Sequence, residues 1–361
     1  MQRLLLGLQT ASNQACEQID DEVEWATMAR LRAISLGERT MNRIAIARQY
    51  VGELLHQRQD IIAAWIGGSV ARGEDTALSD IDLRLMVPGT GPMSRAELDV
   101  WREGIFIEGA LVFQQNYANP EAVLNSPFKA TEIYDALILY DPTGFVTQLQ
   151  QSVRPVYMQP QWLGKRLAYW LESARTAFAD FRKAVEAVDA LHICAALGMF
   201  TYACSSIPLL RAGITPSSTR ALLQLGPIAP TLKTQLAEFE GLTQRNAGDV
   251  LALEPILREA SPLFNASWGQ EAEYLIAKAL WMAQQGQHQA ALHVAWVHIL
   301  IAARDCLQRN NPVELVAGTD VMQRWLHRNS MHEPALLAEK IQGAEILLQQ
   351  VEVLVNEIGG D

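Results

Sequence analysis

The sequence predicts an α+β fold, with short strands in the first part of the chain and helices throughout the rest. Residues 61–66 and 136–140 are short apolar runs that stop at glycine or proline turns, as buried strands do. Residues 81–87 alternate between polar and apolar side chains, which is typical of a strand. Residues 161–361 are rich in Ala, Leu and Gln and hold no convincing strand. Because 361 residues exceed what one core usually organises, we expect two domains.

The N-terminal segment is expected to be helical over residues 15–58, with an interruption near Gly37. Apolar residues at positions 44, 47, 51, 54 and 55 recur at helical spacing and predict one buried face. We assign residues 1–24 to an N-terminal helical extension, residues 25–150 to the sheet-containing domain and residues 151–361 to a helical domain.

The turn Gly67-Gly68-Ser69 follows the first predicted strand. Glycine permits backbone angles and close approaches that a Cβ atom would block. Ser69 stands where a short helix could begin, and serine is favoured as an N-cap. Backbone N–H groups and a hydroxyl at such a turn can bind an anion, so this turn predicts a site for a triphosphate.

Two aspartates with one residue between them follow this turn. Asp80 comes eleven residues after Ser69, and Asp80, Asp82 and Arg84 lie on one face of the predicted strand. Two carboxylates so close together repel each other unless a cation lies between them. Mg²⁺ prefers oxygen ligands and is usually held by one or two carboxylates together with substrate phosphates. The alternative is a surface strand that carries two solvated aspartates.

The next elements are punctuated by turn residues. Glycine and proline at residues 88–92 break the chain, and Ser94 with Glu97 forms a capping-box pattern that predicts a short helix. Glu108 lies in an apolar, strand-like run at residues 105–112, where a charge needs a partner such as a metal ion. A glutamate that faces water from an edge strand is the alternative. The run at residues 136–140 ends at Asp141 before a proline, and a helix should start near Phe145.

The second part of the chain has the pattern of packed helices. Apolar residues at positions 167, 170, 171, 174, 177, 178 and 181 form a stripe that indicates a core-facing helix. Prolines between residues 205 and 265 predict short helices in that stretch. The turn at Gly286, between two Ala-rich segments, predicts a helical hairpin.

The Gly-Gly-Ser turn and the Asp-x-Asp pair, in this order and at this distance, resemble the signature of the DNA polymerase β-like nucleotidyltransferase superfamily. The resemblance implies a small mixed sheet, two Mg²⁺ ions held by Asp80 and Asp82, and Glu108 as a further metal ligand. The residues that it implies for nucleotide binding are Gly67, Gly68, Ser69 and Arg72. A small catalytic domain followed by helices is similar in kind to the antibiotic nucleotidyltransferases, such as kanamycin nucleotidyltransferase.

The activity that this resemblance implies is Mg-dependent transfer of a nucleoside monophosphate, AMP from ATP, onto a hydroxyl of a small-molecule acceptor. In that group a carboxylate near the acceptor takes the hydroxyl proton. The candidates here are Glu172 and Asp180, which lie within about 80° of each other on a helix. The alternative is that both are acids on the solvent-exposed face of that helix. Further candidates for phosphate contacts are Arg84, Lys165, Arg166 and Lys183. Arg72 and Arg84 could equally pair with Glu74 or Asp75.

Composition and charge narrow the range of partners. The net charge of −11 and the lack of a lysine or arginine cluster argue against a nucleic-acid partner and favour a cationic acceptor. Hydrophobic residues at 49% suffice for packed cores, and no apolar run suggests a membrane span. The four cysteines lack CxxC spacing and fit free thiols in a reducing compartment, so we expect a cytoplasmic protein. The apolar helical faces would also suit a homodimer.

Two other functions fit the same sequence. The transferase chemistry could act on a hydroxyl of a protein, as it does in some members of the superfamily. The chain could instead be a non-catalytic nucleotide-binding module that uses its helical part as an interaction surface. A deep acidic cleft favours the small-molecule acceptor, and an open site with an exposed apolar rim favours the protein acceptor.

Overall fold

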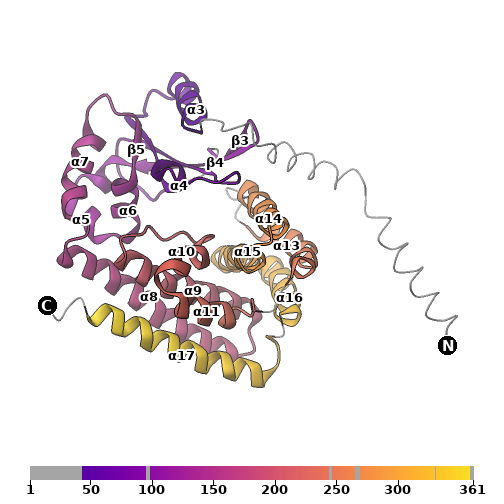
Figure 1. Cartoon of the computed structure of the whole chain (residues 1–361). Helices are drawn as coiled ribbons and strands as arrows, with labels where there is room; N and C mark the ends of the chain where they lie inside the picture. The colour runs from indigo at the N-terminus through magenta and orange to yellow at the C-terminus, as the bar shows by residue number, and fades with distance from the viewer. Residues whose placement is uncertain (1–42, 95–97, 244–245, 265–268, 330, 358–361) are drawn as a thin grey trace, which may run out of the picture. The chain divides into compact units, whose positions relative to one another are not determined.

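The computed structural model describes residues 43–94, 98–243, 246–264, 269–329 and 331–357 (Figure 1). Backbone contacts group the chain from residue 42 onward into one compact unit, so the predicted boundary near residue 150 stays a prediction. The predicted extension at residues 1–24 and the helix predicted ahead of residue 43 lie outside the described residues. The described part confirms the α+β class, because it combines one small mixed sheet with many helices.

The sheet has five strands in the order β3-β4-β2-β1-β5. Its strands are β1 (Ala63–Ile66), β2 (Ile81–Val87), β3 (Val100–Arg102), β4 (Ile105–Phe113) and β5 (Leu137–Tyr140). Strands β2 and β4 pair in parallel, and the other neighbours pair antiparallel. Strand β4 therefore lies inside the sheet, which excludes an edge-strand position for Glu108.

The register between β2 and β4 places two of the predicted site residues side by side. Asp82 pairs with Glu108, and Arg84 pairs with Ala110. Side chains alternate between the two faces of a strand, and paired residues of neighbouring strands share a face. Asp82 and Glu108 are thus presented on the same face of the sheet, although they are far apart in the chain.

Short helices surround the sheet. They are α3 (Arg43–Gln57), α4 (Gly68–Arg72), α5 (Pro120–Asn125), α6 (Pro127–Asp135) and α7 (Phe145–Val153), with 3-10 turns at Gln114–Tyr117 and Arg154–Val156. Helix α7 begins at Phe145 as predicted. Helices α5, α6 and α7 group together beside the sheet (Figure 1) and pack against a core that contains the fully buried Trp65.

No strand occurs among the described residues after Tyr140, as expected. The helices that follow are α8 (Pro160–Glu186), α9 (Ala190–Arg211), α10 (Ala221–Ile228), α11 (Pro230–Phe239), α12 (Ala247–Leu251), α13 (Glu254–Ala260), α14 (Gly269–Gln284), α15 (His288–Arg309), α16 (Pro312–Arg328) and α17 (Pro334–Asn356), with a 3-10 turn at Ser261–Leu263. Helices α8, α9 and α17 pack side by side (Figure 1), and α14 with α15 forms the predicted hairpin around Gly286. Together these helices enclose one large apolar core.

One local prediction differs from the structure and another stays untested. Ser94 forms an isolated antiparallel bridge with Leu111 and so extends the sheet, while residues 95–97 of the predicted capped helix are outside the described residues. Pro208 lies inside α9, where a break was expected. Helix α9 is buried on nearly every side, and that burial outweighs the loss of one backbone hydrogen bond near its end.

Helices α9 and α15 are each long and apolar enough to cross a membrane by length and composition. Neither helix was predicted to have this length of apolar sequence, because polar residues interrupt both stretches. Inside the structure, 83% of the apolar window of α9 and 89% of that of α15 are buried by other parts of the protein. Both helices thus occupy the centre of the helical core, as core helices of this length do.

Candidate active site

The Gly-Gly-Ser turn joins β1 to α4 and touches the aspartate strand directly. Gly67 takes the N-cap position in an extended conformation, so the prediction of Ser69 as N-cap is wrong by two residues. Gly68 has a φ of +64°, and a Cβ atom built on it would lie 1.8 Å from Oδ2 of Asp82. Only glycine fits at this position, because the Asp82 side chain occupies the space that a Cβ atom would need and the positive φ disfavours other residues.

The loop between α4 and β2 is braced from α3. The Arg43 guanidinium donates to the carbonyls of Thr76, Ala77 and Ser79 and pairs with Asp75 at 2.9 Å. The Ser79 hydroxyl in turn accepts from the Thr76 amide at 2.8 Å. These bonds hold the loop at the point where the chain enters β2, and so they set the position of Asp80.

The three predicted metal ligands converge. Carboxylate oxygens of Asp80, Asp82 and Glu108 all lie within 4.8 Å of one another. The Glu108 side chain is buried, while the two aspartates are partly accessible from the cavity described below. Three carboxylates with nothing but oxygen donors match the ligand preference of Mg²⁺, so the residues present fit this ion.

A buried arginine lies behind this carboxylate cluster. Arg84 pairs with Glu132 at 2.9 Å and with Glu108 at 3.6 Å. Burial lowers the pKa of Arg84, but the carboxylates of Glu132, Glu108 and Asp82 outweigh that effect and raise its pKa above the ordinary value. Arg84 is therefore a permanent cation that holds Glu108 and Glu132 in place, and it is less available for a phosphate.

Helix α14 contributes two side chains that the sequence analysis missed. The Tyr274 hydroxyl donates to the Leu78 carbonyl at 2.8 Å, next to Asp80. The Lys278 ammonium donates to the Tyr274 hydroxyl and to Thr219 Oγ1, both at 2.9 Å. Burial raises the pKa of Tyr274, with Asp80 adding to the effect, and burial lowers the pKa of Lys278 against the pull of Asp80 and Asp82.

The charges of these groups do not cancel. The carboxylates of Asp80, Asp82, Glu108 and Glu132 outnumber the two basic side chains beside them, Arg84 and Lys278. An excess of negative charge in a partly buried site is costly without a counterion. A divalent cation would reduce that excess.

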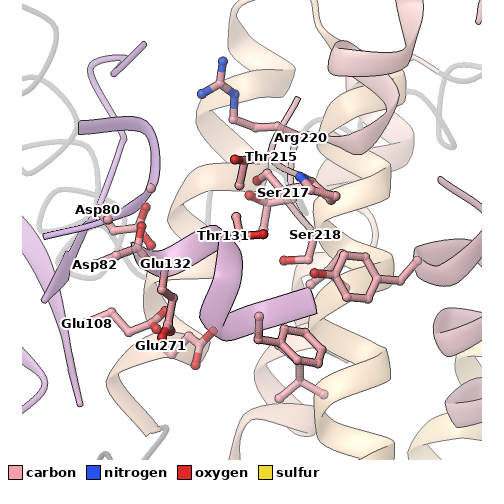
Figure 2. Close-up of a pocket in the computed structure, with 18 of the residues that line it drawn as sticks. Asp80, Asp82, Glu108, Thr131, Glu132, Thr215, Ser217, Ser218, Arg220 and Glu271 are labelled. Carbon is pink, nitrogen blue, oxygen red and sulfur yellow. The ribbon is translucent and has the colours of Figure 1, made fainter. Parts of the chain in front are cut away.

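A cavity of about 690 Å³ opens in front of the carboxylates. Figure 2 shows Asp80, Asp82, Glu108, Glu132 and Glu271 on one side of it and Thr215, Ser217, Ser218 and Arg220 on the other. The first group comes mainly from the sheet part, with Glu271 from α14, and the second from the α9–α10 connection. Sheet and helical parts thus build the cavity together.

The predicted nucleotide-binding residues Gly67, Gly68, Ser69 and Arg72 all line this cavity. Arg72 is already paired with Asp135 at 2.8 Å and with Glu74 at 3.0 Å, as the alternative interpretation expected for Glu74. Burial lowers the pKa of Arg72, and the two carboxylates raise it above its ordinary value. In this structure the Arg72 guanidinium links α4 to α6 through its ion pair with Asp135.

The other predicted residues lie elsewhere. Glu172 and Asp180 line a second cavity, of about 770 Å³, beside α8, with their side chains 74% and 57% exposed. Lys183 pairs there with Asp180 at 3.9 Å, and Lys165 stacks over Trp162. Buried Arg166 donates to the Leu124 and Tyr157 carbonyls. The structure therefore does not bring these residues to the carboxylates.

No protein-family model matches the chain, and no curated protein matches its sequence. The assignment of a function therefore depends on the geometry of the site and on the resemblance of its motifs.

Proposed function

We propose that the protein is a nucleotidyltransferase that transfers AMP from ATP to a hydroxyl of a small-molecule acceptor. The observation that carries this proposal is the convergence of Asp80, Asp82 and Glu108 beside the Gly67–Ser69 turn in one cavity. A volume of about 690 Å³ lies within the range of roughly 300–1,000 Å³ typical of small-molecule sites.

The phosphate chain of ATP would lie between the aspartates and the hydroxyl-bearing side of the cavity. Ser69, Thr219, Arg220 and Lys278 line this region and offer hydroxyl and cationic donors. Arginine and lysine both bind phosphate oxygens well. Arg220 also donates to the Glu74 carbonyl, which places its guanidinium close to the end of α4.

The reaction joins the acceptor oxygen to the α-phosphorus of ATP, breaks the bond from that phosphorus to pyrophosphate, and releases the hydroxyl proton. Bound Mg²⁺ would polarise the phosphate oxygens and stabilise the charge of the leaving pyrophosphate. Asp80, Asp82 and Glu108 would hold the ion, while Lys278 would contact the leaving phosphates. Glu271, a buried carboxylate of the same cavity, would accept the proton in place of Glu172 and Asp180.

A protein acceptor is the second candidate, and one observation favours it. Met93 and Phe128 line the same cavity, and each is 49% exposed. Exposed apolar side chains at a cavity rim are suited to contact with another protein. A small-molecule acceptor remains the first candidate because the cavity volume suits it. Only the local cluster of Asp80, Asp82 and Glu108 favours a cationic one, since acids and bases are nearly balanced over the whole lining.

The first experiment is titration of the purified protein with a non-hydrolysable ATP analogue, with and without Mg²⁺. We expect binding that requires Mg²⁺ and that Asp80→Asn and Asp82→Asn each abolish. Glu172→Gln and Asp180→Asn are matched controls, since both remove a helical carboxylate outside this cavity and should bind like wild type. Pyrophosphate release in the presence of candidate acceptors then identifies the substrate.

Absence of analogue binding under every condition would contradict the nucleotidyltransferase proposal and the nucleotide-binding module alike, and would leave the helical part as a surface for interaction with another protein. Analogue binding that survives both aspartate substitutions would show that the nucleotide lies elsewhere. A cytoplasmic location and a homodimer stay predictions, to be tested by fractionation and by sedimentation of the purified protein.

A further inference from the structure

His293 of α15 bridges two acceptors in the wall of the cavity. Its Nδ1 lies 2.8 Å from a carboxylate oxygen of Glu240, and its Nε2 lies 2.8 Å from the Ser218 carbonyl oxygen. The side chains of His293 and Glu240 are only 7% and 4% exposed. The backbone carbonyl of Glu240 also accepts a hydrogen bond from the Trp296 indole at 2.9 Å. Glu240 is therefore bound to α15 through both its side chain and its backbone.

The two partners define the protonation state of the ring. A carbonyl oxygen can only accept, so Nε2 must carry a hydrogen and donate it. An ionised carboxylate also can only accept, so Nδ1 must donate as well. The ring is then an imidazolium paired with Glu240. Burial lowers the pKa of His293, but the Glu240 carboxylate and both hydrogen bonds outweigh it and raise that pKa.

Ser218 belongs to residues 215–220, which we term the hydroxyl loop. Side chains of this loop bond to three neighbouring parts of the chain: Thr215 donates to Asp135 of α6 at 2.6 Å, Thr219 accepts from Lys278 of α14 at 2.9 Å, and Arg220 donates to the Glu74 carbonyl, just after α4, at 3.3 Å. The loop has no regular secondary structure at residues 215–217, so side-chain bonds must hold it. The bond from His293 to Ser218 lies between the contacts of Thr215 and Thr219.

We propose that His293, as an imidazolium anchored by Glu240, is a positioning residue that holds the hydroxyl loop in place across the cavity from the carboxylate cluster. The inference rests on the proposed nucleotide site, because the loop presents Thr219 and Arg220 to the phosphates of that site. Loss of the Nδ1 proton would set a ring lone pair against the Glu240 carboxylate. The ring would then turn away and release the Ser218 carbonyl.

Other charged groups surround the pair. Lys340 of α17 donates to the carbonyls of Glu238 and Phe239, just ahead of Glu240, and burial lowers its pKa to about 8. Glu271 and Lys278 of α14, Arg304 of α15 and Arg220 of the loop are further charged residues of the same cavity. The pH dependence of the loop must therefore be measured against a variant that changes only the His293 pair.

The first test is the state of the ring in the full-length wild-type protein. Nitrogen NMR of histidine-labelled protein should show both ring nitrogens of His293 protonated at pH 7, with the signal assigned by its loss in His293→Gln. In Glu240→Gln the ring should be neutral at pH 7, with the proton on Nε2. A neutral wild-type ring at pH 7 would overturn the proposal, and if His293→Gln fails to fold, the histidine signal that changes in Glu240→Gln supplies the assignment.

The second test separates positioning from general stability. Hydrogen exchange of the hydroxyl loop should accelerate in His293→Gln, and affinity for the Mg²⁺-bound ATP analogue should fall by about tenfold or more, as for other residues that orient ligands. His298→Gln is the matched control, because His298 is equally buried in α15 but donates to the Leu257 carbonyl, away from the loop. We expect that control to keep wild-type exchange in the loop and wild-type affinity.

The pH profile completes the test. Loop protection and analogue affinity in wild type should decline as pH rises through the raised pKa of His293, whereas Glu240→Gln should lack this step. Unchanged exchange and affinity in His293→Gln, with Asp80→Asn still defective, would refute the positioning role and leave the nucleotide site standing. If wild type binds no nucleotide, the proposed function fails, while ring protonation and loop exchange still decide whether His293 anchors the loop.

Discussion

The lack of a side chain at Gly68 leaves room for the Asp82 carboxylate. Gly68→Ala puts a Cβ atom 1.8 Å from Asp82 Oδ2 in a left-handed conformation, which alone costs about 1–2 kcal/mol. We expect Mg²⁺ affinity to fall by about tenfold or more because the carboxylate must move. Gly67→Ala is the control, since its Cβ would meet Asp82 Cβ at 3.9 Å, an ordinary contact. Calorimetric Mg²⁺ titration of the two variants should separate them, and equal losses would contradict the steric argument.

Glu271 offers a second prediction at the residue scale. If its carboxylate accepts the acceptor's proton, Glu271→Gln should lower kcat by about 10²–10⁴-fold. Affinity for the Mg²⁺-bound ATP analogue should stay near that of wild type, because the proton acceptor is not a phosphate ligand. Pyrophosphate release and equilibrium binding measure the two quantities. A variant with wild-type kcat would remove Glu271 from the mechanism.

The local pattern around Asp80 and Asp82 predicts the convergence that the structure shows, because both acids follow a glycine turn and lie on one strand. Glu108 was predictable as a charge in an apolar run. Lys278 was not, since a lone lysine in an Ala-rich helix usually faces water. Lys278 follows Glu271 by seven residues and Tyr274 by four, so all three lie on one helix face. This spacing of polar residues is the sequence feature from which Lys278 could have been predicted.

Between elements, Gly198 allows α9 and α15 to approach closely. A Cβ atom on Gly198 would lie 2.6 Å from Leu300 Cβ, so Gly198→Ala overpacks this contact at a cost of about 1–3 kcal/mol. Gly164 in α8 has no atom within 4 Å of such a Cβ, and Gly164→Ala should stabilise by about 0.4–1 kcal/mol. Urea unfolding of both variants measures the contrast. Stabilisation by both would show that the α9–α15 contact can widen freely.

The two buried histidines of α15 should respond to pH in opposite directions. Burial lowers the pKa of His298 from 6.5 to about 3, so its folded form stays neutral while the unfolded form takes up a proton. The stability that depends on neutral His298 is therefore present above pH 6.5 and lost as pH falls from 6.5 toward 3. The raised pKa of His293 gives stability that is present below 6.5 and lost as pH rises through the raised value.

The measurement for His298 is urea unfolding of wild type and His298→Gln at several pH values between 7 and 4. Glutamine keeps a donor for the Leu257 carbonyl but takes up no proton. The stability advantage of wild type over the variant should shrink as the pH falls. A difference that stays constant over this range would rule out the neutral buried ring.

Element types were predictable from alternation in β2, from apolar runs in β4 and β5, and from turn residues next to α7 and inside the α14–α15 hairpin. The bridge between Ser94 and Leu111 was not predictable, because a capping-box pattern is local and the bridge depends on a strand later in the chain. Gly109, next to Glu108, also has a reason that the sequence does not show, because it packs against Leu98. A Cβ atom there would lie 2.5 Å from Leu98 Cβ, in the chain that leads to β3.

On the scale of the whole molecule, Tyr274 links the helices to the carboxylate cluster. Its ring stacks on Phe106 of β4 with centroids 5.2 Å apart, and its hydroxyl donates to the Leu78 carbonyl. Tyr274→Phe leaves the ring and removes that bond, at a cost of about 1 kcal/mol in stability. Analogue affinity should fall as well, since Lys278 loses a partner. Tyr169→Phe, at a half-exposed position of α8, should change neither quantity.

The cooperation between sheet and helices could not be read from the sequence. Phe106 belongs to the helical core although it comes from β4, and Arg220 reaches the Glu74 carbonyl from a different part of the chain. Periodicity reports which face of an element is buried, but it does not report which distant element covers that face. The position of the hydroxyl loop in the cavity could not be predicted either, because the loop has no periodic pattern.

Because β2 and β4 pair in parallel, the distance in space between Asp82 and Glu108 does not depend on the number of residues between them in the chain. Extra residues inserted between Val87 and Ser94 would lengthen the connection and leave Asp82 opposite Glu108. One extra residue inside β4 ahead of Glu108 would turn that side chain to the opposite side of the sheet. A distant relative could therefore carry this third acid at almost any separation from the first two, and a search by fixed spacing would overlook it.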